Sequence, residues 1–311
     1  MRRESTRRAV LAGAGAAAAG ALAGCGGSGG DEENLTWYHA DLAAELSKEM
    51  VSAVTDNDVA ATLATAGSQL AALGKVDAGD GGFAVAAGDL VTMAWRGSGV
   101  PAVSTAHRKL RGVAALYPLF VTIVARPDAE ASTLADLAGE TVDVGAADTR
   151  RGVTARRVVT GVDADLSTTA VPTEKLGSRL KSGDVDASIL MGEWPLPAVA
   201  DLAPDVQLLG LADDARQKVA AGTKWLLPGR LPAAVYAGQD HAIPTVATKA
   251  VLVTRRSMPN GIVTRTTQAI VENAHTFTHH PSYLPAKGAK SRATRGLPID
   301  LHGGADEYLN F

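Results

Sequence analysis

Apolar residues along most of the chain alternate between short continuous runs and runs with helical spacing. Continuous runs rich in Val, Ile and Leu are typical of buried strands, and they predict strands at residues 83–87, 110–125, 141–146, 187–191, 206–211 and 246–253, with Val171 in a further short strand. Apolar residues three and four apart predict helices at residues 41–54, 69–73, 149–160, 174–181, 197–202 and 262–275. Strands that alternate with helices indicate an α/β fold with parallel sheets.

The first 24 residues follow a different pattern. Four arginines precede an apolar run of 14 residues at positions 9–22. Such a run is too short to span ~30 Å of hydrocarbon as a helix, and a basic segment before it is typical of a secretory signal peptide. We therefore predict a signal peptide over residues 1–24. Residues 6–11 also resemble a twin-arginine motif, which is compatible with export of a folded protein.

Cys25 is the only cysteine of the chain, and it ends the sequence Leu22-Ala23-Gly24-Cys25. This sequence resembles a bacterial lipobox, in which the thiol receives a diacylglyceryl group and the cysteine becomes the new N-terminus. The alternative is an ordinary small buried residue. A single cysteine excludes an intramolecular disulfide and any zinc site that needs two thiolates. The Gly-rich and acidic residues 25–34 then predict a flexible tether.

Composition and charge exclude several classes of protein. The 311 residues are 46% hydrophobic, which suffices for a packed core and allows two domains. The formal net charge is −3, so the chain has no excess of basic residues to attract nucleic acid, and we expect no such partner.

The sequence lacks the motifs that would support an enzyme or a metal site. No Gly-x-Ser-x-Gly elbow stands between a predicted strand and a predicted helix, and no phosphate-binding Gly-Lys-Ser/Thr is present. His275 and His279 have the spacing of two metal ligands on one helix face, but no glutamate follows His275 as in a zincin motif. Histidines near a helix C-terminus also suit the helix dipole. We predict no catalytic residue, no metal ligand and no cofactor.

An ordered set of short segments covers about residues 35–311. Its members are Thr65-Ala66-Gly67-Ser68, Ala114-Ala115-Leu116-Tyr117-Pro118, Leu134-Ala135-Asp136-Leu137-Ala138-Gly139 with Val142-Asp143-Val144-Gly145, Val153-Thr154-Ala155-Arg156-Arg157, Gly183-Asp184-Val185-Asp186-Ala187, Pro195-Leu196-Pro197-Ala198-Val199, Ile243-Pro244-Thr245-Val246-Ala247 and the tail from Gly296 to Ala305. In this order, behind a lipoprotein signal, the set resembles TAXI-type solute-binding proteins, the extracytoplasmic subunits of TRAP transporters.

The resemblance implies a type II periplasmic-binding-protein fold, with two α/β lobes and a ligand cleft between them. One lobe would comprise residues 35–115 and 236–311, and the other residues 116–235, with Tyr117 at the first hinge crossing. It also implies a monomer that binds a small organic acid or amino acid and docks on a TRAP membrane permease. With the lipobox, it implies an extracytoplasmic protein anchored to the cell membrane by lipid.

Helix N-termini are suited to hold the carboxylate of such a ligand, because free N–H groups and the helix dipole both favour negative charge. The first candidate is Gly67 with Ser68, where glycine allows close backbone approach; the alternative is an ordinary helix cap. The second is Thr149 with the arginine pair Arg150 and Arg151, of which we select Arg151 as the ligand-binding candidate. The alternative there is a solvated surface pair of arginines.

The remaining candidates flank the expected cleft. Tyr117 would hydrogen-bond or stack on the ligand, or else pack in the core. Trp194, next to Gly192 and Glu193, would form a wall of the cleft, although burial in the core is the alternative. Glu193 would repel a dicarboxylate or pair with a ligand ammonium group. Tyr38 would take the place of tyrosines that the family carries in a longer loop after its first strand.

These features together predict an extracytoplasmic solute-binding lipoprotein that captures a small organic anion or acidic amino acid for a TRAP-type transporter. An ABC-type binding protein has the same fold and is one alternative. A sensory or orphan binding module without a transport partner is another.

Overall fold

The computed structural model describes residues 35–286, 288 and 290–310, which lie within one compact unit, residues 33–311. The predicted signal peptide, the tether and the Cys25 lipidation site lie outside the described residues.

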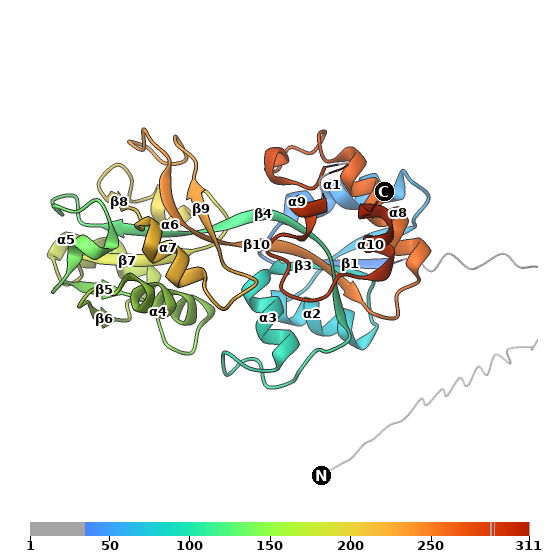
Figure 1. Ribbon diagram of the computed structural model, residues 1–311, viewed down its shortest axis with the longest axis horizontal. Helices are drawn as coiled ribbons and strands as arrows, with labels where there is room; N and C mark the ends of the chain where they lie inside the picture. The colour runs from blue at the N-terminus through green and yellow to red at the C-terminus, as the bar shows by residue number, and fades with distance from the viewer. Residues whose placement is uncertain (1–34, 287, 289, 311) are drawn as a thin grey trace, which may run out of the picture. The chain divides into compact units, whose positions relative to one another are not determined.

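The first lobe is built on three parallel strands in the order β2-β1-β3, extended by β10 and β4, which run antiparallel to their neighbours (Figure 1). Its strands are β1 (Leu35–His39), β2 (Ala61–Thr65), β3 (Phe83–Ala87) and parts of β4 (Leu110–Ala125) and β10 (Ile243–Arg255). Its helices are α1 (Ala44–Thr55), α2 (Gln69–Ala78), α3 (Gly88–Arg96), α8 (Asn260–Asn273), α9 (Lys290–Thr294) and α10 (Gly303–Leu309), with a 3₁₀ turn at Pro281–Tyr283.

The second lobe has parallel strands in the order β7-β5-β6, joined through β7 to the far end of β4. Its strands are β5 (Thr141–Asp143), β6 (Ser167–Thr169), β7 (Ala187–Met191), β8 (Gln207–Leu209) and β9 (Leu227–Leu231). Its helices are α4 (Arg150–Val162), α5 (Leu176–Ser182), α6 (Pro197–Ala200) and α7 (Asp213–Ala220), with 3₁₀ turns at Leu134–Leu137 and Thr173–Lys175.

Strands β4 and β10 run through both lobes and join them (Figure 1). Leu116, Tyr117 and Leu119 of β4 pack in the core of the first lobe, whereas Phe120 packs in that of the second. On β10, Ala247 packs in the second lobe and Ala250 in the first. The lobe boundaries that we expected at residues 115/116 and 235/236 stay a prediction; from these contacts we propose crossings near residues 120 and 248.

The observed elements agree with the hydrophobic pattern where the runs are long. Strands at 83–87, 110–125 and 187–191 have the predicted bounds. Helix α2 is longer than predicted, because it continues through Gly74 to the left-handed Gly79 (φ 101°). The strand predicted at 141–146 ends at Asp143, and Val171 lies outside β6.

Helix α3 was not predicted, although its polar residues Asp89, Thr92 and Arg96 recur at helical spacing. It follows β3 directly, and every residue from Gly88 to Ala94 is buried. The sheets are mixed rather than parallel, since the two strands that cross between the lobes are antiparallel to their neighbours. The predicted class itself is confirmed, since two α/β lobes are joined by crossing strands.

Among the described residues, no helix is both long enough and apolar enough to cross a membrane.

Lys249 is a charged residue in the middle of the crossing strand β10, opposite Pro118 of β4. Burial, with Arg295 and Arg292 nearby, lowers the pKa of its ammonium group to about 8. Its Nζ donates to the carbonyl of Leu116 at 3.4 Å. The protonated side chain is therefore a cost to the folded state at neutral pH.

We expect Lys249→Met to raise the free energy of unfolding at pH 7 by about 1–2 kcal/mol, after allowing for solvent and the lost hydrogen bond. The pKa is about 8 in the folded chain and 10.5 ordinarily, so the unfolded chain binds more protons between these values. Stability of the wild type should rise with pH across this window relative to the variant. Urea denaturation at pH 7 and pH 9.5 measures both effects. The exposed Lys224→Met is the matched control, and a Lys249→Met chain less stable than wild type at pH 7 contradicts the prediction.

Candidate functional site

The carboxyl ends of the parallel strands of the first lobe meet at one edge of its sheet. The side chain of Gln69, at the start of α2, ties this edge together: its amide donates to Asp41 after β1 (3.1 Å) and its carbonyl accepts from the N–H of Ala87 at the end of β3 (2.9 Å). Ligands of open α/β sheets bind outside the carboxyl ends of the strands, so this edge is where a site is expected.

An ion pair joins this edge to the second lobe. Asp89, in the first turn of α3, is fully buried, and its Oδ2 lies 2.5 Å from Nε of Arg150, the first residue of α4. Val153, one turn further along α4, packs against an apolar cluster of the first lobe that includes Leu90 and Met93. The two helix starts therefore hold the lobes together by a charge pair with an apolar contact beside it.

The position of Asp89 depends on Gly88. A Cβ at Gly88 would lie 2.9 Å from Oγ1 of Thr248 on β10, so only glycine lets α3 begin this close to the crossing strand. The start of α3 is therefore in direct contact with β10, and this contact places Asp89 where it can pair with Arg150 of α4.

Each partner of this pair has one unused polar atom. Oδ1 of Asp89 and Nη2 of Arg150 are buried and have no hydrogen-bond partner in the described part of the chain. Buried polar groups are almost always hydrogen-bonded, and an unpaired one costs about 1–3 kcal/mol. The pair offers one acceptor and one donor to a small polar molecule between the lobes.

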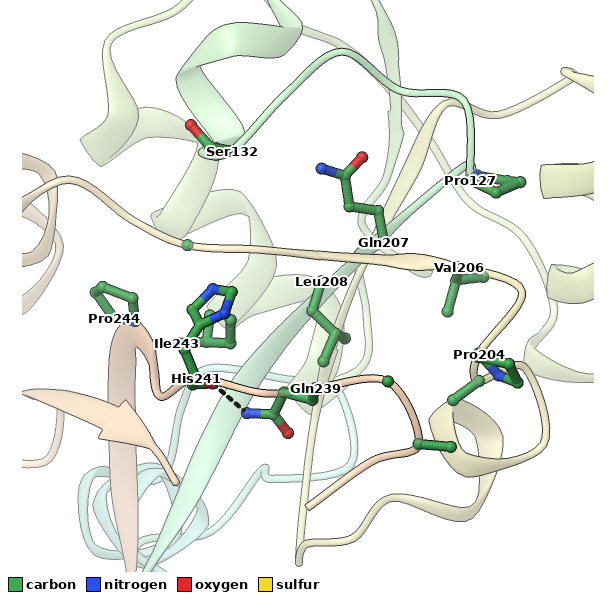
Figure 2. A pocket seen from close by; sticks show the side chains of 14 residues that line it. Pro127, Ser132, Pro204, Val206, Gln207, Leu208, Gln239, His241, Ile243 and Pro244 are labelled. Atoms are coloured by element: carbon green, nitrogen blue, oxygen red, sulfur yellow. Dashed lines mark hydrogen bonds between the residues drawn. The ribbon is translucent and has the colours of Figure 1, made fainter. Parts of the chain in front are cut away.

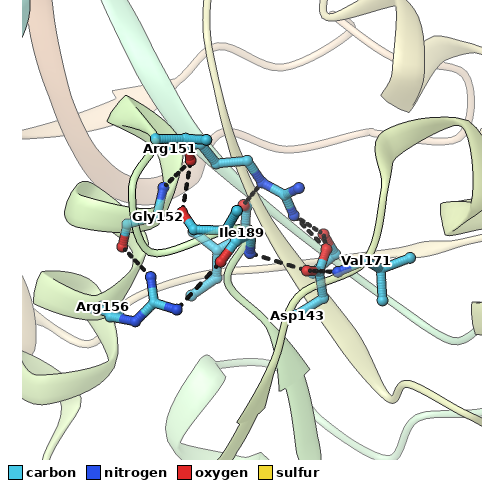
Figure 3. Close-up of polar contacts among 10 residues, drawn as sticks. Asp143, Arg151, Gly152, Arg156, Val171 and Ile189 are labelled. Atoms are coloured by element: carbon cyan, nitrogen blue, oxygen red, sulfur yellow. Dashed lines mark hydrogen bonds and ion pairs between the residues drawn. The ribbon is translucent and has the colours of Figure 1, made fainter. Parts of the chain in front are cut away.

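Arg151, the arginine selected from the sequence, is engaged inside the second lobe (Figure 3). Its Nε donates to the carbonyl of Ile189 (2.8 Å), and its Nη2 donates to Oγ of Ser188 (2.8 Å) and pairs with the buried Asp143. Asp143 also accepts from the backbone N–H groups of Gly145 and Val171. This arrangement fixes the start of α4 on the sheet, and Arg151's role in ligand binding stays a prediction.

The predicted helix N-termini are present. Ser68 caps α2 by accepting from the N–H of Ala71 (3.1 Å), and Thr149 caps α4 by accepting from Gly152 (3.0 Å). Gly67, Ser68 and Thr149 are exposed, and a Cβ at Gly67 would meet no atom within 4 Å. The caps leave room for a ligand, and their part in binding stays a prediction.

Glu193 is the centre of a second connection between the lobes. It follows β7 in the second lobe, and its Oε1 accepts from the hydroxyl of Tyr117 on β4 (2.8 Å). Its Oε2 accepts from the N–H of Ala43 at the start of α1 (3.3 Å), and it forms an ion pair with His279, which follows α8. One carboxylate therefore contacts the hinge and two segments of the first lobe.

Burial and the neighbouring groups shift the pKa values of Glu193, Tyr117 and His280. Burial by itself would raise the pKa of Glu193, but the hydrogen bonds from His279 and Tyr117, the charge on His279 and the Ala43 N–H together lower it. Burial and then the Glu193 charge raise the pKa of Tyr117 far above its usual range. Burial, with His279 beside it, lowers the pKa of His280 to about 4. At neutral pH Glu193 is a carboxylate, and Tyr117 and His280 are uncharged.

Aromatic contacts fix the side chains around Glu193. The Trp194 ring lies against His280, with ring centroids 4.1 Å apart and ring planes inclined by 34°, and its Nε1 donates to the carbonyl of Pro118 (2.9 Å). The Tyr117 ring lies 5.0 Å from His279 and 4.7 Å from His280. Tyr117, Glu193 and Trp194, which the sequence predicts as site residues, are thus brought together.

Tyr38 and Gly192 have mainly structural surroundings. Tyr38 lies over Gly81, where a Cβ would come within 2.4 Å of its ring, and its hydroxyl donates to the carbonyl of Asp80 (3.3 Å). A Cβ at Gly192 would lie 2.7 Å from Leu196, so glycine suits the turn after β7. Their roles in binding stay predictions.

Several residues of this region were missed or not selected from the sequence. Asp89 and Arg150 stand at a predicted strand end and helix start, so the carboxyl-end rule would have found them. His279 and His280 follow a predicted helix, and no sequence signal places them beside Glu193.

A separate pocket of about 420 Å³ lies in the second lobe (Figure 2). Its lining includes Ser132, Gln207, Gln239 and His241, but none of the residues predicted to bind ligand. The amide of Gln239 donates to the carbonyl of His241 (3.0 Å). This pocket therefore shares no residue with the contacts between the lobes.

The solved structures similar to this chain include the following three. One is a TctC solute binding protein from Polaromonas, with 13% identity and a TM-score of 0.48 over 76% of this chain and 83% of that chain. The periplasmic aliphatic sulphonate binding protein SsuA from Escherichia coli has 12% identity and a TM-score of 0.48, over 78% of this chain and 75% of that chain. The GluR0 ligand-binding core from Nostoc punctiforme, in complex with L-glutamate, has 13% identity and a TM-score of 0.44, over 80% of this chain and 97% of that chain.

All three are named as binding proteins or ligand-binding cores. The family comparison covers more of the chain: the model of the NMT1-like family matches residues 29–310. This chain belongs to the NMT1-like family.

Proposed function

We propose that the chain is an extracytoplasmic solute-binding protein that holds a small organic acid or amino acid between its two lobes. The observation that carries this proposal is the Asp89–Arg150 pair, which joins the two lobes and leaves an acceptor and a donor unused. A solute that supplies their missing partners is bound by both lobes at once, and such a solute stabilises the closed arrangement.

The charges of this pair favour an amino acid over a dicarboxylate. Arg150 is suited to a ligand carboxylate, whereas Asp89 repels a second carboxylate and attracts an ammonium group. The helix start capped by Ser68 adds favourable N–H groups for an anion. An α-amino acid carries both charges on adjacent groups and therefore fits this pair best.

The transport partner rests on the ordered motifs of the sequence. Their resemblance to TAXI-type proteins supports a TRAP permease as the partner, with a lipid on Cys25 as the membrane anchor and a monomeric receptor. An ABC-type permease gene next to this one would favour the ABC alternative. A chain without any neighbouring permease gene would favour a sensory or orphan module.

We expect mass spectrometry of molecules released from the denatured chain to find an amino acid or organic acid that rebinds one per chain in calorimetry. Asp89→Asn and Arg150→Gln should each weaken its binding about 10–100-fold, because each removes a charge-assisted contact of about 1.5–3 kcal/mol.

Arg230→Gln, an exposed arginine of the second lobe, is the matched control and should bind as the wild type does. A chain that releases nothing and ignores a panel of L-glutamate, L-aspartate, L-alanine and succinate would contradict the proposal. Equal affinity in wild type, Asp89→Asn and Arg150→Gln would show that the solute binds elsewhere.

In the producing cell we expect the wild-type chain in the membrane fraction, labelled by a fatty-acid probe. Cys25→Ser should be unlabelled and recovered without the membrane, because the only thiol that can carry the lipid is gone. Cys25→Ala tests the same point without a hydroxyl. Membrane retention of both variants contradicts lipid anchoring at Cys25.

A further inference from the structure

We propose that Glu193, His279 and His280 form a binding site for one divalent transition-metal ion between the lobes. The proposal goes beyond solute binding and does not depend on it. It concerns three residues that the Asp89–Arg150 pair does not use.

The ligand atoms are already gathered. One ligand atom from each of the three residues lies within 4.8 Å of the other two, and all three side chains are partly buried. Glu193 comes from the turn after β7, and the two histidines come from the segment between α8 and the Pro281–Tyr283 turn. A metal ion at their centre would replace the direct contact between His279 and Glu193, because both side chains would bond the ion at about 2.0–2.2 Å instead.

His280 shows an unused ligand atom. Its Nε2 is buried and has no hydrogen-bond partner within the described residues. Its backbone is in the left-handed region (φ 50°, ψ 44°), which is uncommon outside glycine. This conformation brings two consecutive imidazoles together, with ring centroids 4.3 Å apart. A strained backbone at a cluster of polar side chains is typical of functional sites.

The surrounding contacts orient the three groups. Tyr117 and the N–H of Ala43 donate to the two carboxylate oxygens of Glu193, and the Trp194 ring packs against the His280 ring. Hydrogen bonds and packing of this kind hold metal ligands in place in known sites, where losing one costs 10–100-fold in affinity. Here the same contacts also hold the site together without the ion.

The donor set selects the class of ion. Two imidazole nitrogens and one carboxylate oxygen suit Zn²⁺, Ni²⁺, Co²⁺ or Cu²⁺, whereas Mg²⁺ and Ca²⁺ prefer oxygen ligands throughout. Three protein ligands leave a position for water or for an atom of a bound molecule. Because the ligands come from both lobes, the ion would favour the closed arrangement.

Metal binding by the full chain, purified without a histidine tag and stripped with a chelator, tests the proposal. We expect one Zn²⁺ per chain by elemental analysis and calorimetry, and no binding of Mg²⁺. His279→Ala and His280→Asn should each weaken Zn²⁺ binding at least tenfold. Co²⁺ should give a visible absorption band in the wild type that is lost in His280→Asn.

His275→Ala is the matched control, since this exposed histidine lies four residues before His279 and outside the cluster. It should bind Zn²⁺ as the wild type does. Thermal melting of each variant without metal checks folding, and Glu193→Gln keeps the size of the side chain if an alanine variant fails to fold. No ion in the wild type, or equal affinity in wild type, His280→Asn and Glu193→Gln, would overturn the proposal.

Discussion

The antiparallel pairing of β4 with β10 is the interaction on which both lobes and the contacts between them depend. Each strand contributes residues to the cores of both lobes, so neither lobe is complete without the crossing. The same strands place Tyr117 beside Glu193 and Thr248 beside Gly88. The hinge therefore also sets the positions of the groups that connect the lobes.

Two connections of different chemistry join the lobes. The Asp89–Arg150 pair is a charge pair with one fully buried member, and burying charges costs free energy unless every polar atom is satisfied. Because Oδ1 of Asp89 and Nη2 of Arg150 have no hydrogen-bond partner among the described residues, the pair contributes little to stability by itself. The same two atoms are suited to bind a polar solute. Glu193, in contrast, is surrounded by donors, and their combined effect overcomes its desolvation and keeps it ionised.

Opening the lobes would expose both connections to water. The charges would regain hydration, while the apolar contact of Val153 with the α3 side would be lost. A solute or an ion shared by the two lobes shifts this balance only by its differential affinity for the closed state. The two proposed sites act on the same equilibrium through separate residues.

The sequence by itself determined the α/β class, the bounds of long apolar strands such as 110–125, and the helix starts at Ser68 and Thr149, because hydrophobic periodicity and capping are local properties. It did not predict α3, which follows β3 directly and whose residues from Gly88 to Ala94 are all buried. Only the tertiary structure decided that Arg151 pairs with Asp143 while Arg150 reaches Asp89, and that two histidines lie beside Glu193. These contacts join residues from 8 to 87 positions apart, and such pairings depend on how the lobes fold and meet.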